Sequence, residues 1–153
     1  MKAILGFLAA ALLVNFMLAR PLRASSPSLE KAFVDKYKAA FETKNKATLE
    51  TFLYTQGANE MALKIYKSLQ TSGIGGKIEF IELVALTPED LKRAAKVQEG
   101  PGGQRFRLPL KPIKKLRIGV IINSEAGTST STSEFMVAET DGKLVIPVPA
   151  NAK

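Results

Sequence analysis

Glu139 is the residue of this chain whose position most favours acid–base chemistry. It lies just before Asp141-Gly142, a dipeptide that strongly predicts a two-residue hairpin loop. Counting outward from that loop pairs Glu139 with Leu144 and places it on the same strand face as Val137. A carboxyl group removed from water has a raised pKa and can act as a general base. The alternative is that Glu139 lies in water beside the turn.

Chemistry that depends on histidine or cysteine is excluded, because the 153 residues contain neither. A Ser–His–acid triad is therefore absent, and the chain lacks the imidazole and thiolate ligands on which most zinc and other transition-metal sites depend. No disulfide supports the fold. The glycine-rich stretches TSGIGGK and EGPGGQR lack the spacing of a phosphate-binding loop and indicate a helix end and a loop. We expect no metal and no cofactor.

Positive charge is concentrated in the segment Gln104–Arg117, which holds six basic residues and no acid in a chain of net charge +8. Alternation along the predicted strands places four cations on one outward face: Arg105, Arg107, Lys115 and Arg117. Such a face suits an anionic lipid or an acidic wall polymer. No aromatic side chain interleaves these positions, so nucleic acid is not an expected partner. The alternative is a solvated face whose charges protect an edge strand.

A third candidate site is the alternating Ser/Thr run before Phe135. Counting back by twos from Phe135 places Ser129, Ser131 and Ser133 on its face and the threonines on the other. Threonine favours strands, and a flexible linker would contain more glycine, so we expect a continuous strand. The serine hydroxyls would then line a ligand cavity beside Phe135, unless a bulge before Phe135 reverses the register.

The elements that position these residues change character at Gly76. Before it, a Ser26-Pro27 start and an apolar stripe at helical spacing predict a first helix over 27–42, followed by a short helix within 43–54 and a third over 60–70. After it, alternating apolar residues predict strands over 77–86, 105–110, 114–123 and the final hairpin, with a short helix near 88–95. The fold class is therefore α+β: three N-terminal helices on a curved antiparallel sheet of about four strands.

This order of elements, closing on EFMVAETDGKLVIPV, resembles the nuclear transport factor 2-like (cystatin-like) α+β cone superfamily over residues 28–149. The resemblance implies a cavity between helices and sheet, and a possible homodimer through the open sheet face. The superfamily that this chain resembles includes ketosteroid isomerases and polyketide cyclases, which use an Asp as general base with an acidic or Tyr partner. Tyr37 and Tyr66, with Glu139, are the candidates for such roles here, although no catalytic constellation of that family matches residue by residue.

The N-terminus carries Lys2 followed by an uncharged, largely apolar segment over residues 3–19. This pattern is typical of a secretory signal peptide, so we expect residues 1–24 to be a leader, cleaved after Ala19 or Ala24, and residues 25–153 to be one domain. The protein would then be exported, to the periplasm or outside the cell. The alternative is an uncleaved membrane anchor, because roughly 17–25 apolar residues span a bilayer.

The sequence as a whole predicts an exported, non-catalytic binding or interaction module with a small apolar or amphipathic ligand in a cone-like cavity. One alternative is a small isomerase- or cyclase-like enzyme with a Glu or Tyr acid–base group. Another is a binder of anionic surfaces through the segment Arg105–Arg117. A closed apolar pocket holding a buried carboxylate would favour the enzyme, and salt-sensitive binding to acidic vesicles would favour the third.

Overall fold

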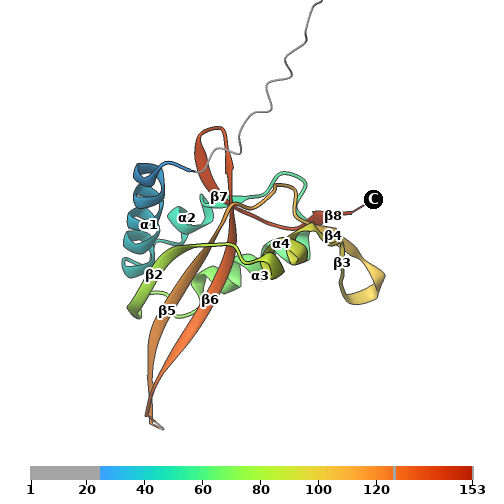
Figure 1. The fold of residues 1–153 in the computed structure, drawn as a ribbon. Coiled ribbons are helices and arrows are strands. Elements are labelled where there is room, and N and C mark those ends of the chain that lie inside the picture. The colour runs from blue at the N-terminus through green and yellow to red at the C-terminus, as the bar shows by residue number, and fades with distance from the viewer. Residues whose placement is uncertain (1–24, 126, 153) are drawn as a thin grey trace, which may run out of the picture.

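The computed structural model describes residues 25–125 and 127–152, and Figure 1 shows how their elements are arranged. The predicted leader, residues 1–24, lies outside this part of the chain. No helix of the described residues is both long and apolar enough to cross a membrane. The fold is α+β, as predicted, with a mostly antiparallel sheet. Its α-helices in the described chain are α1 (Pro27–Glu42), α2 (Lys46–Glu50), α3 (Glu60–Thr71) and α4 (Pro88–Ala95).

Helix α1 begins where its capping residues predict. The Ser26 hydroxyl accepts a hydrogen bond from the Leu29 backbone N–H at 3.2 Å, and Pro27 occupies the first turn. The apolar stripe of the helix packs on the sheet, with Phe33, Tyr37 and Phe41 buried. The local signals and the tertiary packing therefore agree in this element.

The second predicted helix is shorter than expected. Helix α2 ends at Glu50, and Leu53–Tyr54 instead form the two-residue strand β1, which pairs in parallel with the strand that follows the hairpin turn. Helix α3 begins as predicted, because the Asn59 side chain accepts hydrogen bonds from the N–H groups of Met61 and Ala62 at 2.9 and 3.1 Å.

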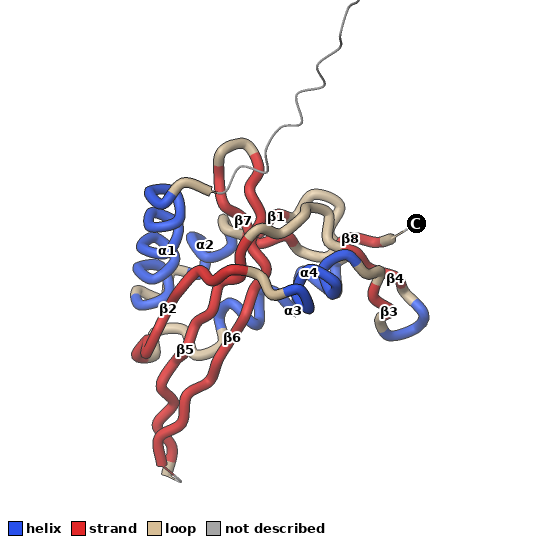
Figure 2. Tube along the Cα trace, viewed as in Figure 1, coloured by secondary structure: helices blue, strands red, loops and turns tan. Residues whose placement is uncertain are grey.

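The main sheet has the strand order β1-β7-β6-β5-β2. Its longer members are β2 (Lys77–Ala85), β5 (Lys114–Ser124), β6 (Gly127–Thr140) and β7 (Lys143–Pro147). Strands β5 and β6 pair without a register break from Ser124–Gly127 to Lys114–Val137. With no bulge, the serines of the Ser/Thr run share the face of Phe135 and the threonines take the other, as the count from the turn predicts. Figures 1 and 2 show this long β5–β6 ribbon extending past the helices.

The predicted turn of the terminal hairpin is confirmed, but the paired strands are shorter than the sequence predicts. Asp141 and Gly142 have φ values of 50° and 70°, which suit a type I′ turn, and Glu139 faces Leu144. Pairing between β6 and β7 covers only residues 138–140 with 143–145. Beyond that point β7 pairs with β1, so the predicted continuation to Val148 along β6 does not form.

The predicted strand over 105–110 belongs to a second sheet. It is β4 (Arg105–Arg107), the centre of a three-stranded sheet with β3 (Gln98–Glu99) and β8 (Ala150–Asn151). The strand ends before Pro109, which has no N–H to donate to a ladder. Arg105 and Arg107 therefore lie in a different sheet from Lys115 and Arg117, and the four cations do not form the one sheet face that alternation predicts.

Core side chains fill the space between α1 and the main sheet. The rings of Phe33 and Phe52 meet edge to face at 5.0 Å between centroids, and Tyr37 lies 5.0 Å from Phe52. From the sheet, the fully buried side chains include Leu116, Val137 and Ile146. Between α1 and the main sheet, the interior of the predicted cone is therefore a packed core.

Candidate functional site

A cavity of about 180 Å³ lies where α3, α4 and β4 meet the β5–β6 pair. Its polar lining consists of Tyr66, Asp90, Arg93, Lys96, Gln98, Arg107, Lys115 and Glu134. Its apolar lining consists of Ala94, Phe106, Leu108, Met136 and Pro149. These residues come from both sheets and two helices, so the cavity exists only because the small sheet and α4 fold back onto the main one.

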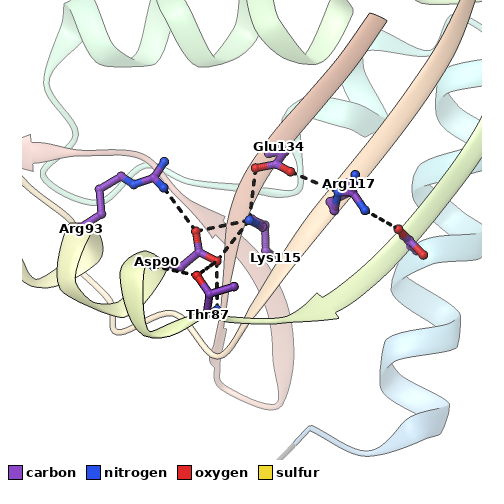
Figure 3. Close-up of polar contacts among 7 residues, drawn as sticks. Thr87, Asp90, Arg93, Lys115, Arg117 and Glu134 are labelled. Atoms are coloured by element: carbon purple, nitrogen blue, oxygen red, sulfur yellow. Dashed lines mark hydrogen bonds and ion pairs between the residues drawn. The ribbon is translucent and has the colours of Figure 1, made fainter. Parts of the chain in front are cut away.

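Asp90 fixes the wall of the cavity that α4 supplies (Figure 3). The Thr87 backbone N–H and hydroxyl both donate to Asp90 Oδ2, at 3.0 and 2.9 Å, and the Asp90 N–H donates back to Thr87 Oγ1 at 3.1 Å. This reciprocal capping box begins α4. The hydrogen bonds from Thr87, together with Lys115, lower the pKa of Asp90 to about 2 from its ordinary 3.8, so this carboxylate is ionised at neutral pH.

Lys115 reaches Asp90 from strand β5. Its Nζ lies 3.1 Å from Asp90 Oδ2 and 3.2 Å from a Glu134 carboxylate oxygen, and its side chain is 14% exposed. Burial disfavours the charged form of Lys115, but the two carboxylates outweigh it and raise the pKa. Lys115 therefore stays protonated at neutral pH and is not available as a base or nucleophile.

The ion pairs continue across the outer face of the sheet (Figure 3). Arg117 donates from Nε to Glu134 at 3.1 Å and from Nη1 to Glu82 at 2.9 Å, and its guanidinium lies 5.4 Å from the centre of the Phe80 ring. Carboxylates therefore balance both sheet cations of the predicted anion-binding set, Lys115 and Arg117. This pairing leaves little uncompensated charge on the sheet to attract an anionic surface.

The structure brings Arg107 and Lys115 to the same cavity and places Arg105 elsewhere, exposed on β4 outside the cavity lining. Among the ion pairs of the described residues, none involves Arg107 or Lys96, whereas Arg93 lies 3.5 Å from Asp90 with its side chain 61% exposed. Of the four cations that line the cavity, Lys96 and Arg107 thus have no carboxylate partner in the described chain, and both are exposed.

Of the predicted acid–base candidates, Tyr66 alone lines the cavity. Its ring packs on Phe135 with centroids 6.1 Å apart, and burial raises the pKa of the phenol, which stays a hydrogen-bond donor. Tyr37 is fully buried in the core, where burial also raises its pKa. Glu139 is half-buried beside the turn. The three candidates do not converge on one place.

The predicted ligand-binding serines lie on the far part of the β5–β6 ribbon. Ser131 and Ser133 are half-buried, Ser129 is exposed, and Phe135 is buried in the core. None of the four lines the cavity between α4 and β4. In the described chain, no cluster of three or more acidic side chains is placed to hold a metal ion.

Sequence reasoning missed Asp90, Arg93, Lys96, Glu134 and Met136 as residues of one site. The Thr87-Pro88 start and the acids that follow it predict the cap of α4 locally. The contact of Asp90 with Lys115 joins residues that are 25 apart in sequence, and no local sequence pattern predicts it.

Comparison with protein-family models, curated proteins and solved structures gives no match to this chain. The resemblance to the nuclear transport factor 2-like cone therefore stays a prediction, and the function of this chain has to be inferred from its own geometry.

Proposed function

We propose that this chain is a non-catalytic binding module whose ligand is a small anion with an apolar part, held in the cavity between α4, β4 and the β5–β6 pair. The observation that carries the proposal is the uncompensated positive charge of Arg107 and Lys96 at an otherwise balanced cavity. A guanidinium group binds carboxylate or phosphate oxygens through two parallel hydrogen bonds, which gives both affinity and orientation.

The apolar lining supports an amphipathic ligand rather than a bare ion. Phe106, Leu108 and Met136 form this part of the wall, and Tyr66 also lines the cavity. The volume of about 180 Å³ is below the roughly 300–1,000 Å³ of pockets for drug-sized molecules. The ligand class that fits is therefore a small aromatic or branched aliphatic acid, or its phosphate counterpart.

The displaced pKa values support binding over catalysis. The pKa of Asp90 is lowered, and the pKa values of Lys115 and Tyr66 are raised, so each group keeps its ordinary ionisation state at pH 7. A general acid–base group works best when its pKa lies near the working pH. The pKa values of these three lining residues are all shifted further from pH 7, which argues against the isomerase- or cyclase-like alternative.

The test is a titration of the protein with benzoate at constant ionic strength, in which two-dimensional ¹H–¹⁵N NMR spectra are recorded at each benzoate concentration. At about 0.3 kcal/mol per non-hydrogen atom, a ligand of benzoate's size binds with a dissociation constant of about 10 mM or tighter. We expect saturable shifts at residues around the cavity with benzoate and none with benzyl alcohol, which lacks the charge.

Two matched variants sharpen this test. Arg107→Gln removes one of the two uncompensated cavity cations and should weaken benzoate binding at least tenfold, whereas Arg105→Gln, on the same strand but outside the cavity, should bind as the wild type does. Equal binding by both variants, or shifts spread over the whole surface, would refute the assignment of the ligand to this cavity.

Export is part of the proposal and rests on the leader pattern of residues 1–24. Intact mass of the protein recovered from cells tests it. A mature chain beginning at residue 20 or 25 supports export with cleavage, and a full-length chain in the membrane fraction would support the anchor alternative.

A further inference from the structure

Strand β6 has one long edge without a partner strand. It pairs with β5 from Gly127 to Val137, and β7 pairs with its other edge only at residues 138–140. Within the described chain, no strand pairs with that edge between Thr128 and Val137. Figure 2 shows the β5–β6 ribbon continuing beyond the helices, and β2 pairs with β5 only as far as Ile121. An open edge presents backbone N–H and C=O groups that are ready to pair with another strand.

This edge lacks the devices that normally prevent pairing. Between Thr128 and Ser133 it has no charge, no proline and no bulge, and its residues alternate regularly. The opposite edge of the sheet, β2, differs: it carries Lys77, Glu79 and Glu82, and its register shifts near Glu79. One edge of the sheet is protected in the usual way, and the other is not.

An exposed apolar stripe on α3 adjoins the open edge. Met61, Ile65 and Leu69 lie one turn apart and are 45%, 51% and 44% exposed. The helix lies against β6, because Tyr66 packs on Phe135. At about 100° per residue, Ile65 and Leu69 are on the flank opposite Lys67.

The direction of that flank follows from the neighbouring helix. Lys67 pairs with Glu50 of α2 at 2.7 Å, so the apolar flank faces away from α2. Since α2 lies between α1 and α3, and α1 packs along β2, the flank away from α2 is on the side of the open β6 edge.

We propose that two copies of this chain associate through the open edge of β6, with the α3 stripes of both copies meeting beside the seam. The β6 strands pair antiparallel about a two-fold axis perpendicular to the sheet. That symmetry keeps the core faces of both copies on the same side, so both α3 helices flank the seam on one face. This contact uses the strand edge and leaves the sheet face open.

The side-chain pattern of β6 matches a second copy of itself. Pairing centred on Ser131 places Ser129 opposite Ser133 and Thr130 opposite Thr132, so each hydroxyl faces one of its own kind, and Thr pairs across strands are favourable. The same register places Glu134 opposite Thr128, which keeps the two Glu134 carboxylates apart. A two-fold dimer therefore brings no like charges together along the seam.

The test is the molar mass of the purified chain by sedimentation equilibrium. We expect twice the mass of one chain for the wild type and one chain mass for Ile65→Lys and Leu69→Lys. The control is Leu91→Lys, because Leu91 is equally exposed, at 44%, but lies on α4. It should remain a dimer. Circular dichroism confirms that each variant is folded.

Charge exchange at the centre of the register tests the identity of the partner. Ser131→Lys and Ser131→Glu each place two like charges side by side at the axis and should each give monomers, whereas an equal mixture of the two should recover dimers. A monomeric wild type, dimers that persist in all variants, or a mixture that stays monomeric would each overturn the proposal.

Discussion

Gly119 of β5 makes room for the ring of Phe80, and replacing it tests the packing of the outer sheet face. A Cβ at position 119 would lie 2.3 Å from Phe80 Cε1 and 2.7 Å from Cδ1 and Cζ. Carbon atoms pack at about 3.5–4.0 Å, so the ring must retreat by about 1 Å. Arg117, whose guanidinium lies 5.4 Å from the ring centre, would lose that contact.

The magnitude follows from two destabilising effects and one stabilising effect. Overpacking costs about 1–3 kcal/mol, and loss of an exposed cation–π contact adds about 0.5 kcal/mol. Alanine in a strand is favoured over glycine by about 0.5–1 kcal/mol. We therefore expect Gly119→Ala to lower the free energy of unfolding by about 1–2 kcal/mol, measured by urea denaturation.

A double-mutant cycle with Phe80→Leu isolates the clash. In the Phe80→Leu background, Gly119→Ala should be nearly neutral, which gives a coupling energy of about 1 kcal/mol or more. If Gly119→Ala stabilises the wild type, or if its effect is the same in both backgrounds within about 0.4 kcal/mol, the packing account of Gly119 is refuted.

The remaining predictions concern the cavity wall. Thr87→Ala removes one half of the capping box and should lower the free energy of unfolding by about 1 kcal/mol in urea denaturation; no change would mean that the cap is dispensable. Because the pKa of Asp90 is lowered to about 2 in the folded protein, its stabilisation is present above about pH 4 and is lost as the pH falls through 2. Thermal denaturation from pH 5 to 2 should therefore show a steeper loss of stability for the wild type than for Asp90→Asn, and parallel curves would contradict this. Tyr66→Phe should leave stability within about 0.5 kcal/mol of wild type and weaken benzoate binding up to about tenfold; unchanged binding would show that the hydroxyl does not contact the ligand.

Local signals predict the helices and the hairpin turn because the residues that decide them are adjacent in sequence. Ser26-Pro27 and Asn59 cap α1 and α3, and Asp141-Gly142 fixes the register that extends through the Ser/Thr run. The same residues cannot predict where β7 leaves β6. That departure depends on β1, a two-residue strand that follows a helix and has no periodicity of its own.

The candidate site was less predictable than the fold for the same physical reason. Arg107 and Lys115 stand out by charge, but alternation alone places them in one sheet. Their convergence on the cavity depends on β4 pairing with β3 and β8, and on Asp90 turning toward β5. These are contacts between distant segments, whose partners the residue pattern does not identify.

The carboxylate of Asp90 serves two structures at once, since it completes the cap of α4 and holds Lys115. The first turn of α4 and the cavity wall should therefore open and close as one cooperative unit. Amide hydrogen exchange at Asp90 and Leu91 would then report events in the cavity, slowing when a ligand is bound there. Under the proposed function, exchange at the cap of α4 would therefore measure whether the cavity is occupied.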